Sequence, residues 1–364
     1  MKSSPTLLLD LNHPVDVHFF RDLVTECRKN GISLYITARQ RRYLPELLNS
    51  YNIPYIKKGK WAHTLLGKIM GLFRETIQLY LLGRKIKADV FISLGSPYAA
   101  LAGKLLGKPV ITLDDTEFNP LIHKIYPRLS DLILTPECFQ KSFGKKHLRF
   151  AGYKESVYLK NVAEEKETDI SEIPGLDQTK PFILVRFVAR HSTHELGKKG
   201  LRPEIKEQMI NCLKQYGRVY ISSEGELPEN LKPYELKAPI AQMHRVMKKA
   251  SLYLGESTTM AAEAALLGTP AILLEDKGRG YTEDIGKRTG LLQRFMAQQW
   301  PEAIKEAKTI LLNRNKEKTA KIKKLERIFS EITDINKLLI WIIQNPERHI
   351  KKLKNFPKKM NEFH

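Results

Sequence analysis

Cysteine is scarce in this chain, and acidic residues are too few to balance the basic ones. Only three cysteines occur among 364 residues. They are widely spaced and odd in number, which excludes a disulfide framework and the paired spacing of a zinc site. No short-period repeat is visible, which argues against a solenoid. The N-terminal apolar stretch is too short for a secretory signal and is interrupted by Asp10, His13 and Asp16, so the sequence predicts a cytoplasmic protein.

The excess of positive charge is large. Lysine and arginine total 61 against 40 aspartates and glutamates, a formal net charge of +21. Such an excess favours a polyanionic partner, which could be nucleic acid, acidic lipid or a phosphorylated substrate. The bias is strongest in 311–330 and 347–364, where lysines alternate with apolar residues at helical spacing and not with stacking aromatics. We therefore expect a basic, surface-lying helix there and no nucleic-acid partner.

Strand-like apolar runs alternate regularly with amphipathic helical segments. The first half contains expected strands at 6–11, 33–39, 89–95, 109–115 and 131–136. After a polar stretch that ends in Pro174-Gly175, the alternation restarts with expected strands at 181–189, 218–224, 251–257 and 270–275. The pattern predicts an α/β protein with two Rossmann-like, doubly wound domains that face each other across a cleft. The expected boundaries are 1–155 for the N-terminal domain, 156–180 for a linker, 181–330 for the C-terminal domain and 331–364 for a basic helix or tail.

The segment 61–87 departs from this alternation. Its apolar residues are spread broadly around an expected helix, and it carries several basic residues and a single acid. Lys68, Arg74 and Glu75 interrupt a stretch that would need about 20 mostly apolar residues to span a membrane. Two interpretations stay open, a helix lying in the membrane interface beside anionic headgroups and a core helix with basic ends.

A turn between two strand-like runs, GESTT at 255–259, precedes a helix rich in small residues. Ser257 is placed to cap that helix, and a helix start with unpaired backbone N–H groups attracts a phosphate. Thr259 and Glu263 share a helix face and lie about 6 Å apart along the axis. A diphosphate on the helix start would bring ribose hydroxyls to Glu263. The alternative is a capped core helix with Glu263 at the surface.

This stretch resembles the nucleotide-binding helix of the glycosyltransferase-B (GT-B) fold, in particular that of the UDP-N-acetylglucosamine 2-epimerases and of the lipid-linked N-acetylglucosaminyltransferases of peptidoglycan synthesis. The epimerase pattern, Asp-Ser-Gly-Gly followed by Glu, Gly and Pro, falls without gaps on Glu256, Ser257, Thr258, Thr259, Glu263, Gly268 and Pro270. The resemblance implies that Ser257, Thr258 and Thr259 lie at the phosphates and that Glu263 holds the ribose.

Over most of residues 6–275 the chain resembles the DUF354 family, an uncharacterised group that is similar to GT-B proteins. The resemblance lies in DLNHPVDVHFF, SLGSPYAALAGKLLGKPVI, AGYKE, VRFVARHSTHELG, ISSEGELP and GESTTMAAEAALLGTPAI. It implies the GT-B fold, with the N-terminal domain on the acceptor side and the C-terminal domain binding the nucleotide sugar.

In the N-terminal domain, the resemblance places polar residues beside the acceptor. His13 or His18 is the expected base or acceptor-positioning residue, since histidine titrates near neutrality, and Asn12 is expected to contact substrate. After the strand at 109–115, Asp115 is expected to act as a base and Asp114 to bind substrate hydroxyls.

In the C-terminal domain, the loop after the first strand faces the donor phosphates in this fold. The resemblance therefore implies diphosphate contacts from Arg190 and His191, and a contact with the leaving group from His194.

Together these expectations favour a glycosyltransferase. It would move a sugar from a nucleoside-diphosphate-sugar donor to a lipid-linked or cell-envelope polysaccharide acceptor, as a peripheral protein at the inner face of the membrane. The nucleotide sugar is a substrate, and neither an obligatory cofactor nor a metal is predicted. Two alternatives stay open: a sugar-nucleotide 2-epimerase, which needs no acceptor, and a non-enzymatic protein that binds a nucleotide or polyanion.

Overall fold

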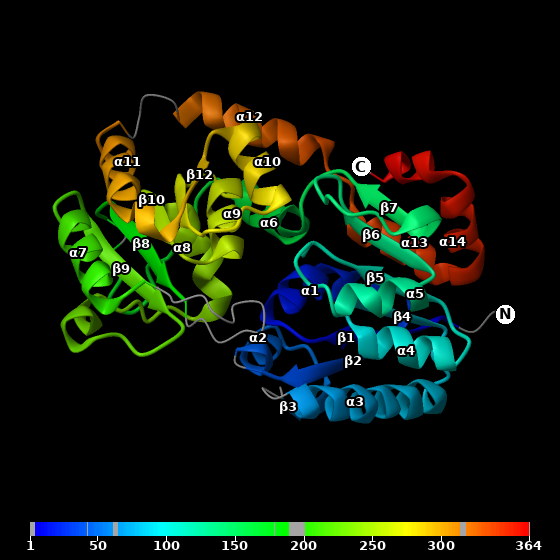
Figure 1. Ribbon diagram of the computed structural model, residues 1–364. Coiled ribbons are helices and arrows are strands. Elements are labelled where there is room, and N and C mark those ends of the chain that lie inside the picture. The colour runs from blue at the N-terminus through cyan, green and yellow to red at the C-terminus, as the bar shows by residue number, and fades with distance from the viewer. Residues whose placement is uncertain are drawn as a thin grey trace. The chain divides into compact units, whose positions relative to one another are not determined.

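A computed structural model describes residues 4–41, 43–60, 65–177, 179–188, 201–313 and 318–363 of the chain. The chain divides into two compact units (Figure 1). Unit 1 consists of Met1–Tyr158 and Glu331–His364, and unit 2 consists of Leu159–Ser330. Each unit is built on one parallel sheet against which helices pack.

The sheet of unit 1 has seven parallel strands in the order β3-β2-β1-β4-β5-β6-β7. The strands are β1 (Thr6–Leu11), β2 (Ser33–Gln40), β3 (Ile56–Lys60), β4 (Val90–Leu94), β5 (Val110–Leu113), β6 (Leu132–Pro136) and β7 (His147–Phe150). The strand order reverses between β1 and β4, which makes this the topological switch point where ligands of open α/β sheets bind. Asp10 of β1 lies at that point, paired in register with Thr37 of β2 and Ser93 of β4.

The central strands are apolar because helices cover the sheet. Leu7, Leu8 and Leu9 of β1 are completely buried, as is usual for strands inside a parallel sheet. The helices of the N-terminal part of unit 1 are α1 (Pro14–Lys29), α2 (Leu44–Ser50), α3 (Leu65–Lys85), α4 (Pro97–Leu105) and α5 (Tyr126–Leu129), and α6 (Lys154–Glu164) begins in unit 1. One core cluster joins Leu8 and Phe91 of the sheet to side chains of α3, α4 and α5.

The C-terminal segment belongs to unit 1 and is not a surface tail. It forms α13 (Ile335–Gln344) and α14 (Pro346–Asn355), and α13 packs against α1. Every isoleucine and leucine of α13 is buried, so its apolar residues are committed to the core of unit 1 while the lysines of α14 face outward. Of the two ranges for which a basic surface-lying helix was expected, 347–364 contains most of α14, whereas α13 lies between them.

Unit 2 has a five-stranded parallel sheet in the order β12-β11-β10-β8-β9. Its strands are β8 (Phe182–Phe187), β9 (Arg218–Ser223), β10 (Leu252–Gly255), β11 (Ala271–Leu274) and β12 (Leu292–Phe295). Its helices are α7 (Pro203–Leu213), α8 (Met243–Lys249), α9 (Thr258–Leu266), α10 (Gly280–Thr289), α11 (Trp300–Leu312) and α12 (Lys318–Glu331). The order reverses between β8 and β10, so the second switch point lies immediately before α9.

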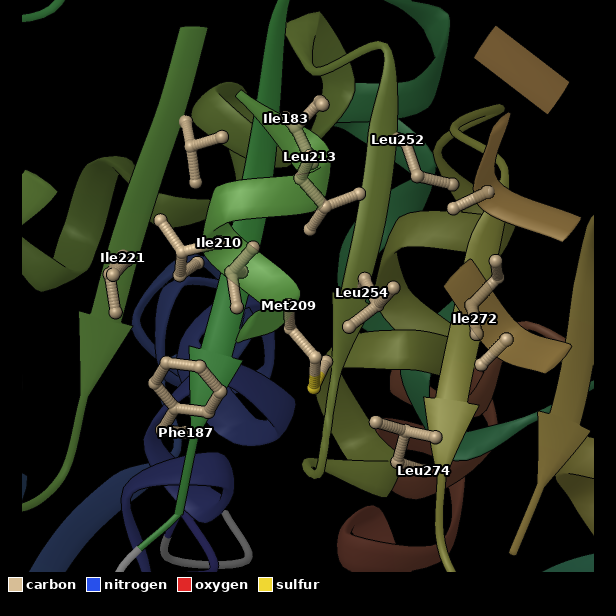
Figure 2. Packing of buried hydrophobic residues seen from close by; sticks show 14 of the residues in the cluster. Ile183, Phe187, Met209, Ile210, Leu213, Ile221, Leu252, Leu254, Ile272 and Leu274 are labelled. Carbon is tan, nitrogen blue, oxygen red and sulfur yellow. The ribbon is translucent and has the colours of Figure 1, made fainter. Parts of the chain in front are cut away.

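The core of unit 2 is formed between this sheet and two of its helices. Figure 2 shows Met209 and Ile210 of α7 beside Ile183 and Phe187 of β8. Alanines of α11 join the same cluster. The predicted α/β class with two doubly wound sheets is thereby confirmed.

The segment expected as a linker, 156–180, is partly helical. It contains most of α6, a helix that crosses from unit 1 into unit 2. Ile170 and Ile173 after it are buried, so this stretch also contributes apolar packing.

A substitution at Gly255 tests how closely β10 approaches β8. A Cβ on residue 255 would lie 2.6 Å from the carbonyl oxygen of Arg186, so Gly255→Ala should destabilise the protein by about 1–3 kcal/mol. The matched control is Gly71→Ala in α3, where an added Cβ would meet no described atom from outside the helix backbone within 4 Å, and helix propensity should raise stability by about 0.5–1 kcal/mol. Urea denaturation of both variants measures the difference. Equal stabilities would contradict the close approach of the two strands.

Candidate functional site

A buried cluster of charges lies at the switch point of unit 1. Lys58 of β3 forms an ion pair with Asp10 of β1 and lies 3.5 Å from Glu75 of α3. Arg39 of β2 pairs with the same Glu75 carboxylate. All four side chains are at most 3% exposed. Two cations and two carboxylates therefore compensate one another out of contact with water.

Hydrogen bonds complete this cluster around Asp10. Ser96 donates to Asp10 Oδ2 at 2.6 Å, and Thr37 donates to Oδ1 at 2.7 Å. Burial alone would raise the pKa of Asp10, but the Lys58 ammonium and the hydrogen bonds outweigh it and hold the pKa below its ordinary value. Asp10 is therefore a fixed negative charge at the end of β1.

Asn12 is held by the same cluster. Its amide nitrogen donates to Asp10 Oδ2 at 2.9 Å, and its carbonyl oxygen accepts from Lys58 at 2.9 Å. Both polar atoms of the side chain are thus oriented by buried charges. The substrate contact of Asn12 remains a prediction. Asp10 and Lys58 would hold the Asn12 side chain in position for it.

His13 and Asp16 form the start of α1. Asp16 Oδ2 accepts from the backbone N–H groups of Asn12 at 2.7 Å and His13 at 3.0 Å, and the N–H of Val15 donates to His13 Nδ1 at 3.3 Å. Burial raises the pKa of Asp16 to about 7, although the two backbone donors and Lys154 oppose the shift. The group of this loop with a pKa near neutrality is therefore the carboxyl of Asp16.

His13 behaves differently from the expectation of a histidine that titrates near neutrality. Its ring retains exposed surface. The protein around the loop nevertheless desolvates the imidazole, and with the positive charges of Arg41 and Lys154 it lowers the pKa of His13 to about 3. The Val15 hydrogen bond also requires an unprotonated Nδ1. His13 is therefore neutral at physiological pH and suits a positioning contact better than proton storage.

His18 lies among aromatic rings. It is buried, its Nδ1 is 3.3 Å from the hydroxyl of Tyr51, and its ring stacks on Tyr158 with centroids 5.7 Å apart. The structure groups Asn12, His13 and Asp16 and places His18 in this separate packing. A role for His18 as base stays a prediction.

At the end of β5, Asp114 and Asp115 have different surroundings. Asp114 Oδ1 accepts from the backbone of Asp115, while Oδ2 lies 2.9 Å from His123 Nε2 and accepts from the Tyr126 hydroxyl at 2.5 Å. Asp115 accepts from the ammonium of Lys154. Asp114 is thus committed to internal hydrogen bonds, whereas Asp115 forms a carboxylate–ammonium pair.

The Lys154–Asp115 pair lies within electrostatic reach of the α1 loop. The charges of both residues act on His13, and the Lys154 charge acts on Asp16. A carboxyl with a near-neutral pKa, a neutral imidazole and an ammonium therefore gather at one edge of the sheet. Such a set can move a proton and balance a developing negative charge.

In unit 2, the predicted helix start is present. β10 ends at Gly255, Ser257 is the N-cap of α9, and its hydroxyl accepts from the N–H of Met260 at 3.4 Å. Thr258 and Thr259 form the first turn, and Gly268 at φ +90° ends the helix as expected. The four alanines of α9 are completely buried, which brings the helix close to its neighbours.

Glu256, just before this helix start, binds the backbone at Val188 and Leu201. Its carboxylate accepts from the backbone N–H groups of Val188 and Leu201, each at 3.2 Å. These two residues flank 189–200, which holds the predicted contacts Arg190, His191 and His194 and lies outside the described residues. The residue that replaces the first Asp of the epimerase pattern thus anchors both sides of the predicted phosphate loop.

Glu263 is buried, so the surface position that the alternative gave it is wrong, although α9 is a capped helix of the core as that alternative expected. Glu263 is 4% exposed, and its Oε1 lies 3.2 Å from Nε2 of His244 on α8. A buried carboxylate beside an imidazole is thus a polar group among the buried alanines of α9. This is the type of group that binding sites retain.

Several polar residues of these two sites were missed by the sequence analysis. Lys58 stands in a polar pentapeptide that did not signal a strand, and His244 lies on a helix without a recognised motif. Lys154 lies in the AGYKE stretch, which carried the family resemblance but suggested no role for the lysine. Only the order of the sheet brings them to the carboxyl ends of the strands. Among the described residues, no group of three or more His, Cys, Asp or Glu side chains is arranged to hold a metal ion.

Comparison with solved structures identifies the fold. S. aureus MnaA with UDP gives a TM-score of 0.66 at 13% identity, covering 95% of this chain and 98% of that one. UDP-GlcNAc 2-epimerase from Neisseria meningitidis bound to UDP-GlcNAc gives 0.63 at 15%, covering 92% and 98%. Streptomyces sp. SF2575 glycosyltransferase SsfS6 with thymidine diphosphate gives 0.60 at 12%, covering 93% and 99%. The protein therefore has the GT-B fold, to which the epimerase and the glycosyltransferase among these structures belong.

Sequence comparison identifies the family. The model of DUF354, a protein family of unknown function, matches residues 6–335. An uncharacterised protein of Methanocaldococcus jannaschii is 25% identical over an alignment 327 residues long, and the match covers 78% of this chain and 93% of that protein. The chain belongs to the DUF354 family, as the resemblance implied.

The raised pKa of Asp16 predicts a pH-dependent stability. Between pH 4 and 7 the folded protein keeps a proton that the unfolded chain releases, so the free energy of unfolding falls with rising pH, by up to about 4 kcal/mol in total. Asp16→Asn removes this contribution. The stability of wild type minus that of the variant should therefore decrease from pH 4 to 7.5, measured by urea denaturation. Asp22→Asn on the same helix is the control, and a constant difference for Asp16→Asn would contradict the assignment.

Removal of Lys58 should lower the free energy of unfolding, because the buried carboxylates lose a compensating cation. Lys58→Met leaves Asp10 and Glu75 buried with one cation fewer, which should cost about 3–5 kcal/mol of stability. Lys57→Met, at the exposed neighbouring position, should change stability by about 0.5 kcal/mol or less. Chemical denaturation distinguishes the two variants. Comparable stabilities would show that the cluster does not depend on Lys58.

Proposed function

We propose that the protein is an enzyme that uses a nucleoside-diphosphate sugar and binds its diphosphate at the start of α9. The observation that carries this proposal is the sequence of β10, Gly255, the Ser257 cap and α9, with buried Glu263 one turn into the helix. The first backbone N–H groups of a helix and its dipole favour an anion at that point. Solved structures with this fold are described with UDP, UDP-GlcNAc or thymidine diphosphate bound, which supports a uridine or thymidine nucleotide.

In this proposal Glu263 holds the ribose. Its carboxylate can accept hydrogen bonds from both ribose hydroxyls, while His244 fixes its orientation. The hydroxyls of Ser257 and Thr259 supply further donors for the diphosphate, and Glu256 accepts from the backbone of Val188 and Leu201. Arg190, His191 and His194 remain proposed diphosphate contacts in that loop.

The reaction we propose is glycosyl transfer to a lipid-linked or cell-envelope acceptor at the inner face of the membrane. Asp16 or Asp115 of unit 1 would accept the proton of the attacking hydroxyl, with Asn12 and His13 positioning the acceptor. The near-neutral pKa of Asp16 supports its role as base. The net charge of +21 supports an acceptor that lies at an anionic surface.

A 2-epimerase is the second candidate. The carboxyl, imidazole and ammonium groups near His13 favour it, because inversion at a carbon needs a proton removed and returned. A solved structure with this fold is described as a UDP-GlcNAc 2-epimerase bound to UDP-GlcNAc, which supports this candidate. An epimerase would act on the nucleotide sugar without any acceptor.

Nucleotide binding tests the proposal most directly. Thermal unfolding with UDP, dTDP, GDP, CDP, ADP and CMP should show stabilisation by one base, about 2.7 kcal/mol at 100 times its dissociation constant. Glu263→Gln keeps the volume and a hydrogen bond to His244 but removes one acceptor for the ribose. It should weaken nucleotide binding by about 10- to 100-fold in titration calorimetry.

The control is Glu283→Gln, on an exposed position of α10 in the same unit. It should leave nucleotide affinity unchanged. A lower melting temperature of Glu263→Gln with unchanged affinity would show a purely structural Glu263 and overturn the ribose contact. Incubation with the matching nucleotide sugar then separates the reactions: a C2 epimer formed without acceptor indicates the epimerase, and nucleotide release that requires lipid extract indicates the transferase.

A further inference from the structure

The outward face of α3 carries a row of exposed apolar side chains. Met70, Phe73, Ile77 and Leu81 are 64%, 59%, 56% and 58% exposed. Their spacing of three and four residues places them on one side of the helix. We call these four residues the α3 stripe. A helix that packs on a sheet normally presents polar residues at such positions, and large contiguous apolar surfaces mark interaction sites.

The orientation of α3 is fixed, so the stripe is not a face that could turn inward. Leu79 on the opposite side is completely buried, and a Cβ on Gly83 would lie 2.6 Å from the ring of Phe91. Glu75 holds the same side of the helix through its ion pairs with Arg39 and Lys58. Rotation of α3 would break these pairs and leave charges unpaired in the core.

The charges around the stripe have one sign. The only acid of 61–87 is Glu75, whose carboxylate is turned into the core. Arg74, Arg84 and Lys85 are exposed on α3, and Lys87 is exposed just beyond its end. The described part of α3 therefore presents apolar side chains and cations, and no carboxylate, to its surroundings.

From this arrangement we propose that the α3 stripe docks on an anionic lipid bilayer. None of the described helices is long and apolar enough to cross a membrane. A stripe of this kind instead inserts at the boundary between headgroups and acyl chains, while flanking cations meet anionic headgroups. A second copy of the chain fits less well, because its own excess of positive charge would oppose the approach. The inference deepens the proposed function and rests on it for the acceptor, which would lie in the same bilayer.

Vesicle flotation of the full-length protein tests the proposal. The wild type should bind phosphatidylcholine vesicles that contain phosphatidylglycerol, bind pure phosphatidylcholine at least about tenfold less, and be released by salt. Phe73→Gln/Ile77→Gln should reduce binding to the anionic vesicles by about tenfold or more. The control Leu312→Gln/Ile322→Gln changes equally apolar exposed residues of unit 2 and should bind like the wild type.

A second pair of variants tests the cationic part. Arg84→Glu/Lys85→Glu should lose binding, whereas Lys351→Glu/Lys352→Glu, which makes the same change of net charge on exposed positions of α14, should retain most of it. If both double variants lose vesicle binding equally, net charge alone attracts the protein to the vesicles, and the docking site on α3 is overturned. Unchanged vesicle binding of Phe73→Gln/Ile77→Gln would also overturn the docking site. So would a wild type that binds no vesicles but self-associates, if the stripe variant abolishes that self-association. Nucleotide stabilisation of the same preparations shows separately whether the proposed enzyme site is intact.

Discussion

The ion pairs of Lys58 and Arg39 with Asp10 and Glu75 are the constraint on which both the site and the surface of unit 1 depend. Removing charges from water is costly, and the cost is offset only if every charge has partners in good geometry. The strands β1, β2 and β3 and the helix α3 must therefore meet in one register. That register orients Asn12 at the switch point, and it also fixes which side of α3 faces outward.

Both sheets place their polar groups where the strand order reverses. In unit 1 the reversal between β1 and β4 brings Asp10 and Ser96 together, and in unit 2 the reversal between β8 and β10 opens the space before α9. Helices that follow adjacent strands diverge at such a point, which leaves backbone N–H groups and short side chains accessible to a ligand. Ser96 and Ser257 cap the helices after β4 and β10 in the same way. Each unit therefore has a serine N-cap on the helix that follows its switch point.

Much of the fold could be predicted, because buried parallel strands and their helices leave a clear periodic pattern. The helix start at Ser257 was also predictable, since capping depends on neighbouring residues only. β3, β7 and β12 were missed because their sequences are short and carry lysine, histidine or arginine, and they are held by pairing with a neighbouring strand. The near-neutral pKa of Asp16, the burial of Glu263 beside His244 and the Lys154–Asp115 pair depend on contacts distant in sequence. No local pattern could indicate them.

The return of the last residues to unit 1 has a consequence for how the chain is made. Residues 331–364 complete a unit whose other part is the first 158 residues, so unit 2 is in effect an insertion. During synthesis, the surface of α1 that α13 covers stays uncovered until the whole of unit 2 has emerged from the ribosome. Unit 2 is contiguous and can fold first. Unit 1 cannot complete its packing, and part of its apolar surface stays exposed, until α13 and α14 have been synthesised.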